Sequence, residues 1–220
     1  MPFGAQARTE RSPPLIPERW RTRTGASVFL SVRVRFTDVH ATVFLDPRQA
    51  TCVDALRKRW DPIMASQIGP HVTVTYPDEI PTLAAMSEHV AGAAREIAPF
   101  RLGLGAIDCF DRPEHGIYVQ VHDLDGGWRS LREVVGHVGT RLAVEPHVTL
   151  VHPRTSDQGR AAWPELAGRS LDGTTMIDEV AVTAFDGSRW VAVETFWLMG
   201  RVDPRTRCRR VERATNPIRV

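Results

Sequence analysis

The chain has 220 residues, of which 42% are hydrophobic and 25% charged, and it carries a formal net charge of +2. This length allows one sizeable domain or two small lobes, and the composition is that of an ordinary globular protein. No apolar run is long enough for a membrane span, and residues 1–24 lack the apolar core of a secretory signal. The three cysteines are scattered without zinc-ligand spacing, which favours a reduced cytoplasmic location over a disulfide framework.

The charge is unevenly distributed along the chain. Residues 1–40 carry a net charge of +4, residues 201–220 carry +5, and residues 41–200 carry −7. We therefore expect three regions: an N-terminal extension over residues 1–40, a single domain over residues 41–200 and an Arg-rich C-terminal tail over residues 201–220. The extension is rich in Arg and Pro, and we expect it to be partly disordered with an additional strand over residues 28–36. The acidic body argues against binding long nucleic acids through the whole surface. The basic termini are candidates for contact with an RNA backbone, and the alternative is that they are solvated tails.

The first half of the domain alternates strands with amphipathic helices. The expected order is a strand over residues 41–45, a helix over 47–60, a strand over 71–76 and a helix over 83–97. Asp46, followed by proline, and Thr82 are the capping side chains that start the two helices. Asp61, which also precedes a proline, is expected to end the first helix.

The second half has the same kinds of element in a less regular order. We expect strands over residues 100–110, 117–121, 147–152, 177–185 and 191–197, and helices over 125–138 and 161–166. Because strands and helices alternate irregularly and include hairpin-like pairs, we predict an α+β fold with mostly antiparallel sheets rather than a doubly wound parallel sheet.

Two segments of the chain nearly repeat each other. Residues 69–77 read Gly-Pro-His-Val-Thr-Val-Thr-Tyr-Pro, and residues 145–153 read Glu-Pro-His-Val-Thr-Leu-Val-His-Pro. An internal duplication that places equivalent strands in two lobes is the simplest interpretation. Side chains at i and i+2 of a strand share a face, so His71, Thr73 and Thr75 should project together, as should His147 and Thr149.

These residue types match what the in-line cleavage of a phosphodiester requires. If the lobes pack face to face about a pseudo-twofold axis, two imidazoles and two hydroxyls converge on one cleft. A neutral imidazole can take a proton from the attacking oxygen while a protonated one gives a proton to the leaving oxygen. The hydroxyls can donate hydrogen bonds to the non-bridging oxygens as charge builds on them. We therefore predict His71 and His147 as catalytic residues and Thr73 and Thr149 as phosphate-binding residues.

The paired His-x-Thr-x segments resemble the motifs of the two-histidine (2H) phosphoesterase superfamily, and in particular of its bacterial 2′-5′ RNA ligase-like branch. The resemblance covers roughly residues 41–200. It implies a bilobal α+β fold in which two mostly antiparallel sheets face a central cleft with helices outside. It also implies metal-independent chemistry on 2′,3′-cyclic phosphates or other RNA-type phosphodiesters, as in RNA processing, and weak 2′-5′ ligation in some members. Which histidine is the base and which the acid does not follow from the motif.

Three aromatic residues are candidates for stacking a base at the rim of the cleft. They are Phe110, Tyr118 and Trp190, of which Trp190 beside the turn at Asp186-Gly187 is the best placed to reach a ligand. The alternative for each is ordinary packing in the core or in a hairpin. Among the other histidines, His152 should point away from the cleft by strand parity, and His40 falls at a strand end or in a loop.

The sequence leaves two hypotheses about function, an enzyme and a binding module. No His, Cys and carboxylate cluster has the spacing of a metal site, so neither a metal nor another cofactor is expected. The first hypothesis is a phosphoesterase that opens cyclic phosphates or cleaves short RNA-type diesters. The alternative is a nucleotide- or RNA-binding module with the same cleft and no useful turnover. The expected partner is a small nucleotide or an RNA end rather than a membrane, and nothing in the sequence demands more than a monomer.

Overall fold

The computed structural model describes residues 18–19, 29–30, 38–80, 82–136 and 145–200. The chain divides into two units, one ending at Phe36 and the other beginning at Thr37. In the first unit, β1 (Glu18–Arg19) pairs antiparallel with β2 (Phe29–Leu30). The rest of the strand predicted over residues 28–36, and the Arg-rich tail over residues 201–220, lie outside the described residues.

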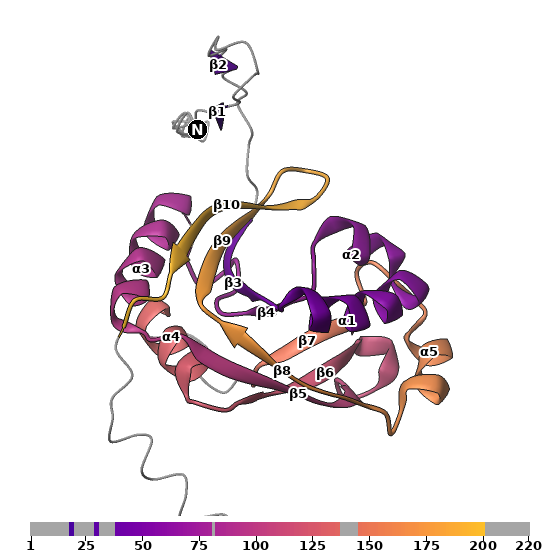
Figure 1. The fold of residues 1–220 in the computed structure, drawn as a ribbon. Coiled ribbons are helices and arrows are strands. Elements are labelled where there is room, and N and C mark those ends of the chain that lie inside the picture. Colours follow the sequence, from indigo (N-terminus) through magenta and orange to yellow (C-terminus); the bar gives the residue numbers. More distant parts are fainter. Residues whose placement is uncertain (1–17, 20–28, 31–37, 81, 137–144, 201–220) are drawn as a thin grey trace, which may run out of the picture. The chain divides into compact units, whose positions relative to one another are not determined.

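The second unit is built from two antiparallel sheets of four strands each (Figure 1). The first sheet has the order β10-β9-β3-β4, with strands β3 (Val39–Phe44), β4 (His71–Thr73), β9 (Glu179–Phe185) and β10 (Trp190–Trp197). The second has the order β7-β6-β5-β8, with strands β5 (Phe100–Cys109), β6 (Ile117–Asp123), β7 (His147–Val151) and β8 (Ser170–Ile177). The predicted α+β fold with two antiparallel sheets is confirmed.

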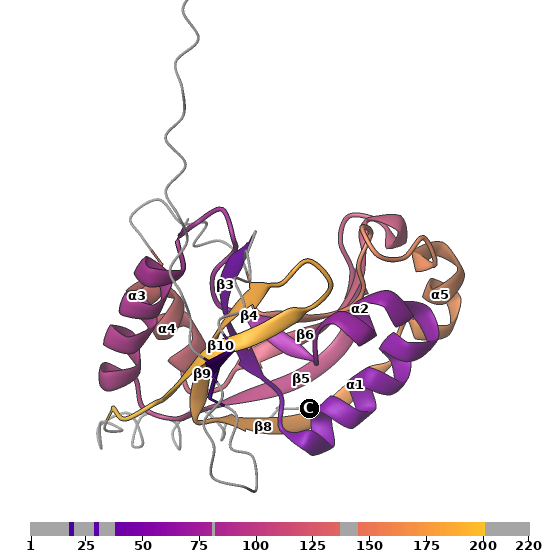
Figure 2. The same cartoon turned by 90° about the horizontal axis from the view of Figure 1, so that it is seen from above.

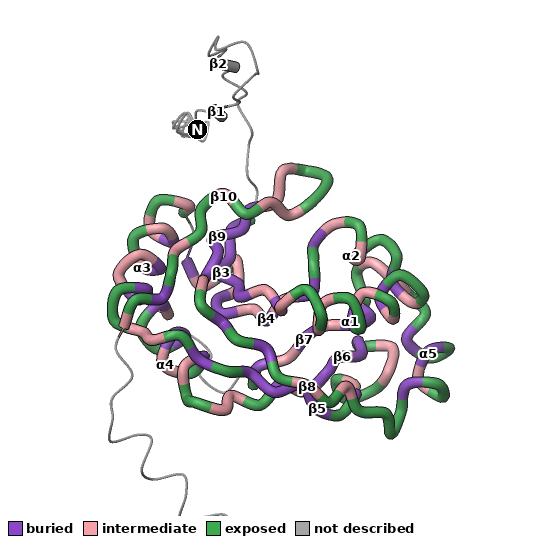
Figure 3. The backbone as a smooth tube through the Cα atoms, viewed as in Figure 1, coloured by how far each residue is buried: buried purple, intermediate pink, exposed green. Residues whose placement is uncertain are grey.

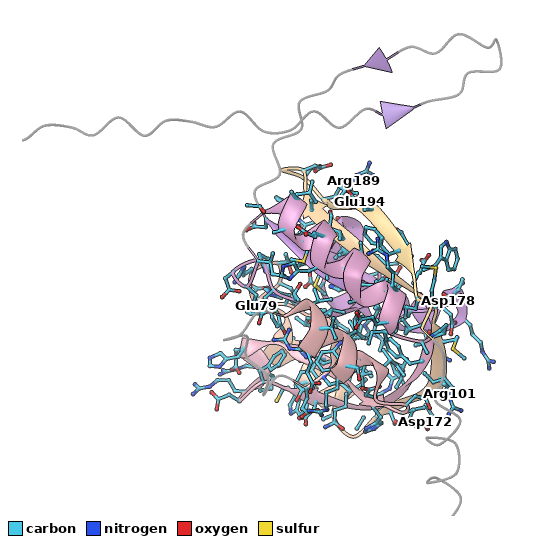
Figure 4. All side chains as sticks on the ribbon, turned by 90° about the vertical axis from the view of Figure 1, so that its left-hand side faces the viewer. Glu79, Arg101, Asp172, Asp178, Arg189 and Glu194 are labelled. Atoms are coloured by element: carbon cyan, nitrogen blue, oxygen red, sulfur yellow. The ribbon has the colours of Figure 1, made fainter. Side chains whose placement is uncertain are left out.

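Helices pack on both sheets, and the first of them packs on the sheet to which the strand before it does not belong. The helices are α1 (Pro47–Trp60), α2 (Pro62–Gln67), α3 (Leu83–Glu96), the 3₁₀ turn η1 (Pro113–His115), α4 (Gly127–Val135) and α5 (Gly159–Leu166). The helix α3 packs on β3, β9 and β10, whereas α1 packs on β7 and β8 although it follows a strand of the first sheet. Figure 2 shows α1 and α3 on opposite sides of the paired sheets, and Figure 4 looks onto α3 with α4 beside it.

The two sheets meet through their edge strands. The strands β4 and β7 each occupy one end of their sheet, and they contact each other. Along both strands the side chains alternate: Val72, Val148 and Leu150 are buried, while the histidine and threonine of each motif are half-buried on the other face. The inner strands of the first sheet, β3 and β9, are the most continuously buried strands (Figure 3). The sheet contact therefore brings the two copies of the repeated segment next to each other.

Side-chain capping starts the two predicted helices as the sequence indicated. The Asp46 carboxylate accepts hydrogen bonds from the backbone N–H groups of Arg48 and Gln49 at 2.9 and 3.0 Å, and Thr82 Oγ1 accepts one from Ala85 at 3.2 Å. The sequence prediction missed α2. Asp61 does end α1, but its carboxylate also accepts a hydrogen bond from Met64 at 3.0 Å, so it starts a second short helix at once.

Two predicted strands differ from the observed ones. The strand predicted over residues 71–76 ends at Thr73, where the chain bends, so Thr75 turns into the core instead of facing the cleft. Thr75 is fully buried, accepts a hydrogen bond from the Ala41 N–H at 3.0 Å and donates one to the Met86 sulfur at 3.3 Å. The strand predicted from residue 177 is β9, and before it the polar segment contains β8, which the sequence did not reveal because five of its eight residues are Ser, Asp, Gly or Thr.

Buried polar side chains connect each motif strand to a helix from the other half. Asp61, at the end of α1, is fully buried and accepts hydrogen bonds from the His152 N–H at 2.9 Å and from Thr155 Oγ1 at 2.7 Å, just beyond β7. On α4, Arg132 is buried, donates to the Val74 carbonyl just beyond β4 and pairs with Glu79 at 2.8 Å. Both edge strands are thus fixed at the end opposite their histidines.

Within the part of the chain that the structure describes, no helix is long and apolar enough to cross a membrane.

Replacing Asp61 by Ala should destabilise the protein by about 2–4 kcal/mol, because buried donors lose their acceptor. Urea unfolding measures the change in the free energy of unfolding. The matched control is Glu165→Ala, since Glu165 pairs with Arg59 at 2.6 Å on the surface, and it should cost less than about 1 kcal/mol. Equal losses in the two variants would contradict the bracing role of Asp61.

Candidate active site

The two motif histidines open the two edge strands. His71 is the first residue of β4 and pairs with Phe44 of β3, and His147 is the first residue of β7 and pairs with Gln120 of β6. Both side chains are half-buried. They are near enough for a charge on His147 to lower the pKa of His71. The structure therefore brings together the two residues that the sequence predicted as the acid–base pair.

Each imidazole is held by the same local hydrogen bond. The Nδ1 atom of His71 lies 2.8 Å from the Gly69 carbonyl, and the Nδ1 atom of His147 lies 3.0 Å from the Glu145 carbonyl. Because a carbonyl oxygen can only accept, Nδ1 carries a proton in both rings. Each Nε2 is then the atom that takes or gives a proton. In both copies a proline separates the carbonyl from the histidine, and its fixed φ angle sets this short turn.

The motif threonines lie on the same faces as the histidines. Thr73 and Thr149 are each two residues beyond their histidine and are half-buried. Thr73 is also fixed through its backbone, since its carbonyl accepts a hydrogen bond from Trp128 Nε1 of α4 at 3.3 Å. This places two hydroxyls beside the two imidazoles, in the arrangement expected from the strand parity.

Both imidazoles are held neutral in the ligand-free protein. Burial, with smaller contributions from the charges of Arg57 and His147, lowers the pKa of His71 from the ordinary 6.5 to about 4, against the opposing effect of the Gly69 carbonyl. Burial also lowers the pKa of His147, against the opposing effect of the Glu145 carbonyl. A bound phosphate would favour the protonated form of a neighbouring imidazole, because opposite charges attract strongly at short range.

Arg57 is a site-supporting residue that the sequence did not reveal. It lies on α1, is 1% exposed, and its Nη2 atom donates to the carbonyls of Met64 at 3.3 Å and Ile68 at 2.8 Å. These bonds fix the segment that leads directly into Gly69 and His71. Its fixed positive charge disfavours a second positive charge on His71. In the sequence it was one of three arginines on an amphipathic helix, with nothing to mark it as buried.

The aromatic candidate Trp190 lies on the His71 side of the site, and His40 packs between Trp190 and His71. The rings of Trp190 and His40 stack with centroids 4.1 Å apart and planes 11° apart, and the His40 ring lies 5.9 Å from that of His71. His40 was predicted at a strand end or in a loop, and it is the second residue of β3; the sequence did not reveal that it is only 7% exposed. Burial lowers its pKa well below the ordinary value.

The other two aromatic candidates lie beside His147. Phe110 packs edge-on against the His147 ring with centroids 5.2 Å apart, and the Tyr118 ring lies 5.4 Å from it. Phe110 and Tyr118 also pack on each other at 4.4 Å. Phe110 is 38% exposed, although it is a large apolar side chain. All three candidates for base stacking therefore lie near a motif histidine.

Two further observations bear on other sites. Among the described residues, no group of three or more His, Cys, Asp or Glu side chains is arranged to hold a metal ion. The expectation that the protein needs no metal stays a prediction.

A cavity of about 410 Å³ lies between Pro62, Ile63 and residues 153–158, at the opposite end of β7 from His147. It therefore lies apart from the histidine pair.

Comparisons with known proteins point to one family. A sequence model of the 2′-5′ RNA ligase superfamily matches residues 44–189. A Staphylococcus aureus (strain Newman) protein named "Putative phosphoesterase" is 27% identical over 153 residues, which cover 66% of this chain and 90% of that protein. E. coli LigT solved with 3′-AMP has a TM-score of 0.54 at 14% identity, covering 74% of this chain and 98% of LigT. A structure described as a phosphoesterase has a TM-score of 0.53 at 12% identity, covering 74% and 99%. At these identities the two structures show a shared fold.

Histidine NMR titrations of the ligand-free protein should show His71 and His147 titrating below pH 6.5, with His71 the lower. The spectra of His71→Gln and His147→Gln assign the two signals. Between the folded pKa values and 6.5, the unfolded chain binds more protons than the folded protein, so the free energy of unfolding should fall as pH falls through this window. A ligand-free pKa at or above 6.5 for either histidine would contradict the burial account.

Proposed function

The chain belongs to the 2′-5′ RNA ligase superfamily, and within it we propose that the protein is a metal-independent phosphoesterase acting on 2′,3′-cyclic phosphates or related RNA-type phosphodiesters. The observation that carries this proposal is the matched pair of histidines on contacting edge strands, each with Nδ1 held by the carbonyl two residues before it. The named relative, a "Putative phosphoesterase", supports the same class of reaction.

The proposed reaction uses one imidazole on each side of the phosphorus. For a 2′,3′-cyclic phosphate, a water oxygen attacks phosphorus and passes its proton to the neutral Nε2 of one histidine. The bond from phosphorus to the 2′ or 3′ oxygen breaks on the far side, and that oxygen takes a proton from the other histidine. This histidine must be protonated before the reaction, and the substrate's negative charge favours that state. Positioned acid–base groups of this kind contribute roughly 10²–10⁴ to the rate.

The two threonines complete the site in this proposal. Thr73 and Thr149 donate hydrogen bonds to the non-bridging oxygens, whose negative charge rises as the fifth bond to phosphorus forms. The two neutral donors can do this without adding a fixed charge next to the imidazoles. Joining a 5′-hydroxyl to a cyclic phosphate is the reverse of diester cleavage, so weak 2′-5′ ligation would use the same two histidines.

Two histidine variants test the proposal against a binding-only protein. His71→Ala and His147→Ala should each lower kcat for a nucleoside 2′,3′-cyclic phosphate by about 10²–10⁴, because each removes one proton-transfer group. The assay is run in EDTA, which should leave the wild-type rate unchanged. The matched control is His89→Ala, since His89 lies on α3 and its Nδ1 contacts the Val135 carbonyl at 3.2 Å, and it should keep kcat within about twofold.

Each outcome of this assay has a definite meaning. Loss of activity in EDTA would contradict the metal-independent mechanism, and activity that survives in both histidine variants would contradict the roles of the pair. Nucleotide binding by calorimetry without product from any cyclic phosphate would instead favour a binding module.

A further inference from the structure

A second cavity opens beside the segment that holds His71. It has a volume of about 310 Å³ and lies between residues 65–69, where α2 leads into β4, and residues 189–192, where β10 begins. Gly69 lines this cavity and also supplies the carbonyl that holds His71 Nδ1. The cavity therefore adjoins the proposed reacting centre. Figure 4 labels Arg189, which lies in the turn between β9 and β10 and lines this cavity.

Trp190 forms one wall of this cavity and is held in a fixed orientation. His40 covers one face of the indole, with centroids 4.1 Å apart and planes only 11° apart. Phe185 is tilted against the indole at 5.5 Å and 50°. The side chain is nevertheless only half-buried and lines the cavity. A flat aromatic surface is thus set in place beside the site before any ligand arrives.

His40 supports this wall from within the first sheet. Its Nε2 atom is buried and has no hydrogen-bond partner within the described part of the chain, which is uncommon for a buried polar atom and costs free energy. Its lowered pKa keeps the ring neutral. The ring therefore acts as a flat spacer that packs between the indole of Trp190 and the imidazole of His71, 5.9 Å away.

We propose that this cavity is the subsite for the nucleobase of the substrate, which stacks on the face of Trp190 that His40 leaves uncovered, with His40 as the residue that positions the indole. The inference rests on the proposed function, since it places the base of the same nucleotide whose phosphate lies between His71 and His147. The cavity is open to solvent, and a volume of about 310 Å³ has room for a single planar base.

The remaining walls of the cavity combine small and polar side chains. Ala65, Ser66 and Gly69 leave room opposite Trp190, while Gln67 and Arg189 add hydrogen-bonding groups to the lining. Stacking tolerates any base, because every base has a π-face. The other two aromatic candidates, Phe110 and Tyr118, do not line this cavity and pack on each other beside His147. Of the three, the geometry therefore assigns the base of a mononucleotide to Trp190, on the His71 side.

Calorimetry on the full chain compares two tryptophans of the same strand. Trp190→Ala should raise the Kd of adenosine 2′-monophosphate by about 5- to 100-fold, because a stacked base is lost. Trp197→Ala is the matched control, since Trp197 ends β10 and is 61% exposed, and it should change the Kd by less than about twofold. Inorganic phosphate, which has no base, should lose far less affinity than the nucleotide in Trp190→Ala.

Two variants of His40 test whether this residue positions the indole of Trp190 or only stabilises the fold. His40→Phe keeps a flat ring and removes the unpaired nitrogen, so it should retain nucleotide affinity, whereas His40→Ala should weaken nucleotide binding in the direction of Trp190→Ala. Equal affinity loss for nucleotide and inorganic phosphate, equal effects of Trp190→Ala and Trp197→Ala, or no nucleotide binding by the wild-type protein would each overturn the subsite. A subsite confirmed by these measurements without turnover of any cyclic phosphate would contradict the proposed function alone.

Discussion

The contact between the edge strands β4 and β7 is the constraint on which the site depends. Each strand belongs to a different sheet, and each begins with its histidine. Without this contact the two imidazoles, which lie on separate sheets, would be too far apart to act on one phosphorus atom. Buried bonds from Asp61 and Arg132 fix the far ends of the same strands, each from a helix of the other half. These buried bonds thus help to hold two short strands of different sheets against each other.

The two histidines make the same hydrogen bond to the backbone but have different neighbouring side chains. Both imidazoles have Nδ1 on a carbonyl two residues earlier, which leaves Nε2 for proton transfer in both. Behind His71, however, lie the buried cation Arg57 and the ring of His40, whereas His147 lies against Phe110 and Tyr118. The burial of His71, together with the positive charge of Arg57, makes the two imidazoles unequal in how readily they take a proton. A duplicated motif can in this way supply one site with two different proton affinities.

Much of this arrangement follows from local sequence, because the signals are local. The repeated Pro-His-Val-Thr segments predicted the two motif strands, and the capping residues Asp46 and Thr82 predicted where helices begin. The fold class followed from the order of strands and helices. Thr75 was misplaced because strand parity holds only while the strand continues, and the chain bends after Thr73. The helix α2 was missed because the Asp61-Pro62 pair both ends one helix and starts the next.

The parts that could not be predicted depend on contacts between distant segments. His40 on β3 and Trp190 on β10 are 150 residues apart and meet only because β9 lies between their strands in the sheet. No periodic pattern in one sequence marks such a pair. Arg57 is similar, since burial of its guanidinium depends on the path of α2 and the loop after it. These residues distinguish this site from a generic pair of His-x-Thr motifs.

A crystal structure of the protein with adenosine 2′-monophosphate tests the central claim most directly. The account predicts that the phosphate lies between the two histidines, with each Nε2 atom within hydrogen-bond distance of a different phosphate oxygen, about 2.6–3.2 Å. It would be contradicted by a phosphate that contacts only one of His71 and His147, or by one that binds instead in the cavity beside Pro62 and Arg154.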